Sequence, residues 1–199
     1  MTTATAIQSA LKAKYEKEIV PKLMKDLGIK NPMQVPRIVK VVVNVGMGSF
    51  LQGSKDSSGV ENNIARITGQ KPVVRKSRMS VSNFKLREGM PVGAVVTLRK
   101  AAAYNFVDKI INVVYPRVRG FQGVKRNIFD KDGNCSFGFK EHTVFPETSE
   151  SDVHKTHGVQ VTIVTSTKNK EHAFKLMEAF GFPFMKAPKT AEELAEENN

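Results

Sequence analysis

Positive charge is the most concentrated chemical feature of this 199-residue sequence, whose formal net charge is +12. Residues 71–100 contain eight basic side chains and a single acidic one, Glu88. Three apolar side chains, Met79, Phe84 and Met90, are interleaved with these cations. Cations neutralise phosphates, and exposed apolar groups pack on sugars or unpaired bases, so the combination indicates an RNA-binding surface. The alternative is a solvated charged loop with Phe84 packed into the core.

A glycine-rich segment, Gly46–Lys55, carries the second candidate chemistry, which is nucleotide binding. A dinucleotide-binding loop requires a third glycine where this chain has Leu51. A P-loop requires lysine and then serine or threonine after its second glycine, whereas Ser54 and Lys55 occur in the opposite order. A nucleotide-binding enzyme that uses this loop is therefore kept only as the alternative hypothesis.

No other residues have the spacing of a reactive site. The cluster of His142, Asp152, His154 and His157 lacks the paired, cysteine-containing spacing of a structural zinc site, so we predict polar loop residues there. Cys135 is the only cysteine and has no evident activating partner. We therefore expect no catalytic residue, no metal and no cofactor.

The single cysteine also helps to predict the cellular compartment of the protein. A chain with one cysteine forms no intramolecular disulfide, which favours a reducing compartment. The N-terminal residues lack the apolar core of a secretory signal, and no apolar run approaches the roughly 20 residues needed to span a bilayer. These observations predict a cytoplasmic protein without a membrane partner.

Hydrophobic periodicity indicates the elements that must position the charged residues. Apolar residues at helical spacing predict four helices, and β-branched runs predict five strands. The predicted helices cover residues 4–27, 58–70, 101–118 and 170–181, and the predicted strands cover residues 37–48, 71–77, 91–100, 137–145 and 158–167. We expect a kink or break at Pro21 and a helix end at Pro116.

The loose alternation of these elements predicts an α+β fold, not strict βαβ units. We expect a mostly antiparallel sheet, helices packed on one face, and a long basic loop between two strands. Residues 1–186 are predicted to form a single RNA-binding domain with a helical N-terminus. Residues 187–199 are predicted to be an acidic, disordered tail.

Side chains that alternate along three predicted strands suggest what the second sheet face does. One row is apolar: Val39, Val41, Val43 and Val45 in the first strand. The other row is mixed, and it contains Lys40, Asn44, Thr97, Arg99, Gln160, Thr162 and Ser166, with Ile38 and Val42. A solvated sheet face is the ordinary explanation, but it would usually include carboxylates. Their absence favours a face that binds a polyanion.

Several motifs, in order along the chain, resemble the bacterial ribosomal large-subunit protein five family. They are GQKPVVRKSRMSVSNFKLREGMPVGAVVTLR at residues 69–99, YPRVRGFQGV at 115–124, VFPE at 144–147 and FGFPF at 180–184. The resemblance extends from about Tyr15 to Lys186. This chain differs from the usual family pattern at Arg75, Ser77 and Met79, where threonine, alanine and lysine are common.

The resemblance implies a non-enzymatic component of the large ribosomal subunit that binds 5S ribosomal RNA in the central protuberance. It also implies contact with transfer RNA in the peptidyl site, with other proteins of the protuberance and with a protein of the small-subunit head. Matching positions and neighbouring cations give the expected ribosomal-RNA residues Lys40, Asn44, Gln70, Lys71, Thr97 and Arg99. The expected transfer-RNA residues are Arg75, Lys76, Arg78, Ser80, Lys85 and Arg87.

Overall fold

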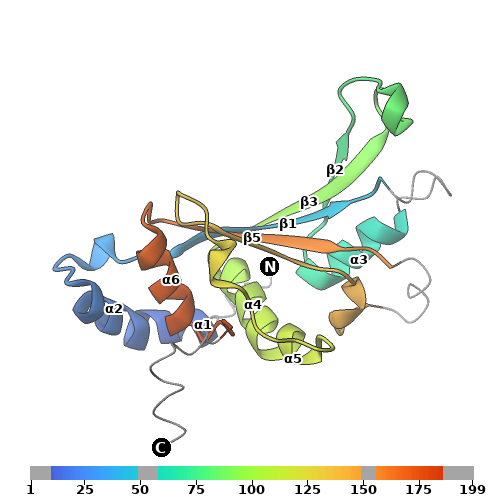
Figure 1. The fold of residues 1–199 in the computed structure, drawn as a ribbon. Coiled ribbons are helices and arrows are strands. Elements are labelled where there is room, and N and C mark those ends of the chain that lie inside the picture. The colour runs from blue at the N-terminus through green and yellow to red at the C-terminus, as the bar shows by residue number, and fades with distance from the viewer. Residues whose placement is uncertain (1–9, 49–57, 149–155, 186–199) are drawn as a thin grey trace, which may run out of the picture.

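The computed structural model describes residues 10–48, 58–148 and 156–185, and within them five strands form one antiparallel sheet. The strands are β1 (Ile38–Gly46), β2 (Val73–Lys76), β3 (Pro91–Arg99), β4 (Cys135–Phe139) and β5 (Val159–Thr165). Their spatial order is β2-β3-β1-β5-β4, and the helices lie on one side of the sheet (Figure 1). The predicted α+β class is confirmed.

Helical segments cover the sheet and build the N-terminal arm of the molecule. The α-helices are α1 (Ala10–Lys14), α2 (Val20–Leu27), α3 (Ser58–Thr68), α4 (Lys100–Lys109), α5 (Tyr115–Arg117) and α6 (Lys170–Ala179). Two π-helical segments are η1 (Tyr15–Ile19) and η4 (Ile110–Val114), and short 3-10 turns are η2 (Pro32–Gln34), η3 (Ser82–Phe84), η5 (Arg126–Ile128) and η6 (His142–Val144). None of the described helices is long and apolar enough to cross a membrane.

Both prolines that were expected to affect helices coincide with an irregular helical turn. A π-helical turn precedes each proline by two residues: η1 precedes Pro21, and η4 precedes Pro116. Proline lacks a donor and clashes with the carbonyl four residues earlier in a regular α-helix. A π-bulge shifts that hydrogen-bond pattern by one residue, which relieves both problems. The chain therefore stays helical past Pro21 to Leu27, whereas it leaves the helix at Arg117, one residue after Pro116, which agrees with the expected helix end.

The hydrophobic core lies between the helices and one face of the sheet. Alternate residues of the central strands are buried there, including Val41, Val43 and Val45 of β1. Val39 was predicted to join this row, but it is 41% exposed, whereas Ile38 is buried. An irregularity in the β1–β5 register between Ile38 and Lys40 reverses the alternation at this point. The sequence prediction for Val39 and Ile38 was therefore wrong.

One further predicted element is shorter than expected. The strand predicted over residues 137–145 ends at Phe139, and the chain then turns into η6. This change buries His142 and Phe145 completely, and Phe145 packs on the rings of Phe106 and Phe139. The apolar residues after Phe139 thus join the core from a turn, not from a strand.

A buried hydroxyl in this core gives a test of the structure. Tyr115 is 4% exposed and packs on Phe121 at 4.7 Å between ring centroids, yet its hydroxyl has no hydrogen-bond partner within the described residues. An unmatched buried polar group costs about 1–3 kcal/mol. We expect Tyr115→Phe to raise the free energy of unfolding by about 1 kcal/mol in a urea titration. A decrease would mean that the hydroxyl is satisfied.

Candidate nucleic-acid interface

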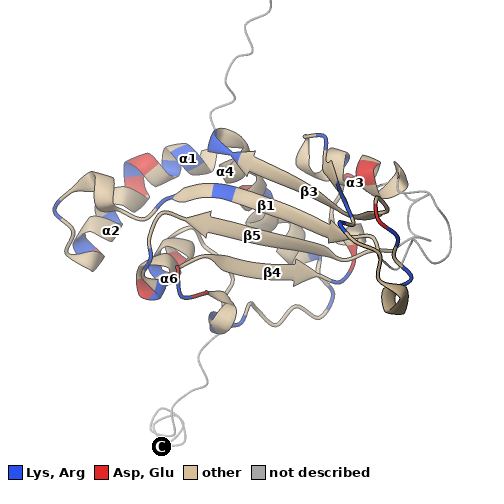
Figure 2. Cartoon of the chain, turned by 90° about the horizontal axis from the view of Figure 1, so that it is seen from above, with Lys and Arg blue, Asp and Glu red and all other residues tan. Residues whose placement is uncertain are grey.

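The sheet face opposite the helices is the surface on which the predicted RNA contacts should lie. We call it the polar sheet face and define it by its outward-facing residues. They are Val73 and Arg75 of β2, Val95, Thr97 and Arg99 of β3, Lys40, Val42 and Asn44 of β1, Gln160, Thr162 and Val164 of β5, and Ser136 and Gly138 of β4. Figure 2 shows this face with the helices behind it.

Strand register brings four of the predicted RNA-contact residues together. Lys40 lies directly opposite Arg99 on the neighbouring strand, and Val42 lies opposite Thr97. Asn44 lies opposite Val95 on one side and Gln160 on the other, and its amide donates to the Gln160 carbonyl at 3.5 Å. The face therefore presents amide and hydroxyl groups in its centre and a pair of cations at one end.

The charge distribution on this face is one-sided. None of the five strands contains Asp or Glu, as the absence of red from the strands in Figure 2 shows. Within the described residues, carboxylates approach within 4 Å of only two lysines, Lys12 and Lys109, and neither lies on this face. Like charges directly across two strands destabilise a sheet. The adjacency of Lys40 and Arg99 is therefore unfavourable for the sheet on its own.

The predicted RNA-contact residues at the β2 edge lie further apart than those on β1 and β3. Gln70 and Lys71 are exposed in the segment between α3 and β2. Because Val73 pairs with Val95 in antiparallel register, this segment enters the sheet beside the Thr97 end of β3. Arg75 pairs with Gly93 and so shares the polar sheet face, although it was expected among the transfer-RNA residues.

The remaining predicted cations lie on a hairpin that extends β2 and β3 away from the body (Figure 1). We call residues 77–90 the hairpin tip. The predicted contact residues Arg78, Ser80, Lys85 and Arg87 are all exposed on it, and Lys76 precedes it at the end of β2. Phe84 and Met79 are 70% and 64% exposed, so the alternative in which Phe84 packs into the core is wrong.

Hydrogen bonds give the hairpin tip a defined shape of its own. Ser77 N donates to Met90 O at 2.8 Å, and Val81 exchanges backbone hydrogen bonds with Leu86. The side-chain hydroxyl of Ser80 accepts from Glu88 N at 3.0 Å. The irregular sequence therefore forms a narrow hairpin closed by η3, and these hydrogen bonds supply the support that sequence periodicity did not reveal.

The histidines predicted to be polar loop residues are in fact buried, insofar as the structure describes them. The rings of His142 and His157 stack at 4.0 Å between centroids, and His157 N donates to His142 Nδ1 at 3.3 Å. Asp152 and His154 lie outside the described residues. Within the described part of the chain, no three potential ligands are grouped to hold a metal ion.

The surroundings of Cys135 explain why this cysteine is not a reactive site. Burial raises the pKa of Cys135 to about 12, so its thiol is protonated and unreactive near neutral pH.

The glycine segment Gly46–Lys55 extends from the end of β1, and residues 49–57 lie outside the described residues. Both neighbours of β1 are antiparallel to it, whereas nucleotide-binding glycine loops belong to parallel βαβ units.

The structure adds residues of β4 to the polar sheet face that the predicted RNA contacts omitted. Ser136 pairs with Thr162, and their hydroxyls lie 3.0 Å apart. Gly138 pairs with Gln160 and leaves the surface beside that side chain flat. The alternation of Cys135, Ser136, Phe137, Gly138 and Phe139 carried this signal, but the segment was not assigned to a strand at its start.

The sequence of the chain is similar to those of known ribosomal proteins. A family model described as "Ribosomal protein L5" matches residues 31–87, and a second model, described as the C-terminus of the same ribosomal family, matches residues 91–184. The large ribosomal subunit protein uL5 of Thermotoga sp. (strain RQ2) is 51% identical over 177 residues, covering 87% of this chain and 95% of the relative. The uL5 of Syntrophotalea carbinolica is 50% identical over 176 residues, covering 88% and 96%.

Proposed function

The chain belongs to the ribosomal protein L5 family, and from this premise we propose that its polar sheet face binds 5S ribosomal RNA in the central protuberance. The family consists of structural, non-enzymatic proteins of the large ribosomal subunit, which in bacteria is cytoplasmic. This membership sets aside the nucleotide-binding enzyme as an alternative. The single observation that supports the proposal best is the register that gathers Lys40, Asn44, Thr97 and Arg99 on a face without carboxylates.

The chemistry of this face suits a folded RNA. Hydroxyl and amide groups such as Thr97, Asn44 and Gln160 exchange hydrogen bonds with 2′-hydroxyls and base edges, which allows a protein to select RNA by shape. Lys40 and Arg99 attract phosphates. Exposed valines between them, such as Val42, offer apolar contact to sugars. The sheet is held rigidly by its core on the other side, so these groups meet the RNA with little ordering cost.

We expect Asn44→Ala and Thr97→Ala each to weaken binding of isolated 5S RNA by about 1–2 kcal/mol, the cost of leaving a buried polar partner unmatched. A filter-binding titration with purified protein measures the effect. Ser166→Ala is the matched control. The Ser166 hydroxyl accepts a hydrogen bond from Arg37 N just beyond the end of β5, away from Asn44. A protein that binds RNA without selectivity would instead show equal salt slopes for 5S RNA and an unrelated duplex.

The hairpin tip is proposed to contact transfer RNA in the peptidyl site. Arg78, Lys85 and Arg87 carry positive charge on a projection remote from the body, and Ser80, Lys85 and Arg87 help to line a shallow hollow of about 380 Å³ there. A narrow arm of this kind can reach a second RNA while the sheet holds the first. Other surfaces are proposed to meet proteins of the central protuberance and one of the small-subunit head.

A further inference from the structure

A second basic surface lies on α6 and η5, at the end of the sheet remote from the hairpin tip (Figure 1). It surrounds an open hollow of about 540 Å³. We call it the α6 pocket, and it is lined by Arg126, Asn127, Lys170, Glu171, Phe174 and Lys175. None of these residues belongs to the polar sheet face or to the hairpin.

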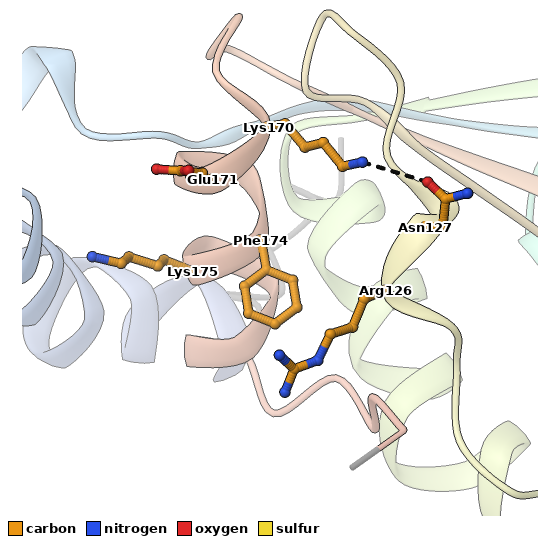
Figure 3. Close-up of a pocket in the computed structure, with 6 residues that line it drawn as sticks. All are labelled: Arg126, Asn127, Lys170, Glu171, Phe174 and Lys175. Atoms are coloured by element: carbon orange, nitrogen blue, oxygen red, sulfur yellow. Dashed lines mark hydrogen bonds between the residues drawn. The ribbon is translucent and has the colours of Figure 1, made fainter. Parts of the chain in front are cut away.

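The centre of the α6 pocket is a cation–π contact between two side chains. The Arg126 guanidinium lies 5.3 Å from the centre of the Phe174 ring, as Figure 3 shows. Phe174 is held from behind by Phe184, at 4.7 Å between centroids, and by Phe129 at 6.1 Å. The ring is therefore held in place, and the cation–π contact keeps the Arg126 guanidinium beside it.

Two lysines also line the pocket: Figure 3 shows the Lys170 ammonium directed toward Asn127, and the Lys175 ammonium pointing away from the Phe174 ring. Lys170 Nζ lies 3.5 Å from Asn127 Oδ1, and Lys175 Nζ donates to the backbone carbonyl of Asp26 at 3.1 Å (Figure 3 shows the first of these). Neither lysine, nor Arg126, has a carboxylate within 4 Å in the described part of the chain. Glu171 is the only acidic residue that lines the pocket, so its net charge is positive.

We propose that the α6 pocket binds an unpaired nucleotide of RNA, as a second RNA site separate from the polar sheet face. An unpaired base can pack on the Phe174 ring and the Arg126 guanidinium, because RNA-binding proteins hold unpaired bases on aromatic rings and guanidinium groups. Lys170 then attracts an adjoining phosphate, whereas Lys175 is directed toward Asp26. An acidic peptide would use the positive charges alone, whereas an unpaired nucleotide also uses the aromatic ring beside them.

Photo-crosslinking of the full chain tests this proposal. A short oligouridine carrying thiouridine is irradiated with the protein, and crosslinked peptides are mapped by mass spectrometry. We expect crosslinks within residues 124–129 or 170–175. Arg126→Gln combined with Lys170→Gln should lower their yield by about tenfold, because a stacking surface and a phosphate contact are lost together. Phe174 is left intact because it packs on the core.

A matched control separates local contacts from total charge. Lys17→Gln combined with Lys140→Gln removes two exposed cations elsewhere and should leave the crosslink yield within about twofold. Affinity for isolated 5S RNA should be retained by both double variants, so loss of this site and loss of the proposed 5S function are distinguishable. Absence of crosslinks in these segments, or equal losses in both double variants, would overturn the proposal. So would binding of an oligoglutamate peptide there in place of the oligouridine.

Discussion

Replacing Lys40 and Arg99 together with glutamate is expected to lower the affinity for 5S RNA by about 100-fold or more at moderate salt. The two side chains lie directly opposite each other on β1 and β3, so one stretch of phosphates would meet both. Each reversal removes an attraction and adds a repulsion at the same place. The dependence of affinity on salt should also become shallower, by about one to two units of slope, because fewer counterions are released.

Filter binding across a salt series measures both quantities. Lys17→Glu combined with Lys22→Glu changes the net charge equally but places the change on the N-terminal helical segments η1 and α2, away from the polar sheet face. That control should reduce affinity by less than about fivefold, through the long-range field alone. If the two double variants lose affinity equally, only net charge matters, and the polar sheet face is not the binding surface.

The polar sheet face could be predicted from sequence because strand alternation is a strict rule. Once β1 and β3 are recognised, a period of two places Asn44 with Lys40 and Thr97 with Arg99. Pairing between the strands, which brings Lys40 opposite Arg99, depends on register and is fixed by the core packing of many residues at once. The membership of the face was thus accessible for these four residues, whereas its geometry and its β4 residues required the structure.

The errors arose where backbone irregularities interrupt a regular period. The bulge at Val39 reverses the alternation, and nothing in a run of valines and isoleucines indicates where an extra residue is inserted. The π-turns before Pro21 and Pro116 are equally hard to predict, because their hydrogen bonds are made by the backbone. His142 was misjudged because burial of a polar ring depends on a partner, His157, that lies 15 residues away in the chain.

The structure of the hairpin tip could not be predicted from sequence for a different reason. Its sequence has no helical or strand period, since both faces of the hairpin are exposed and no core selects apolar residues there. Pairing of Val81 with Leu86 and of Ser77 with Met90 nevertheless gives it a defined path. The cations at its end are therefore carried on a supported arm. This separation from the sheet is what makes the two proposed RNA contacts independently testable.

Replacing Arg78 and Lys85 together with glutamate is accordingly expected to leave the affinity for isolated 5S RNA within about threefold of the unaltered protein. Both side chains lie in the hairpin tip, beyond β2 and β3, so they are remote from Asn44 and Lys40. Ribosomes that carry this variant should bind transfer RNA in the peptidyl site about tenfold to 100-fold more weakly, because two phosphate contacts become repulsive.

Ribosomes assembled with the variant, and transfer RNA retained on them in a filter assay, provide the measurement. Arg78→Lys combined with Lys85→Arg keeps both charges and should bind transfer RNA almost normally, which separates charge from the detailed shape of the tip. Neither exposed side chain forms a hydrogen bond within the described structure that the glutamates would break, so folding should be preserved. A large fall in 5S affinity with unchanged transfer-RNA binding would reverse the assignment, because the hairpin tip would then belong to the 5S interface and the sheet would need another explanation for its paired cations.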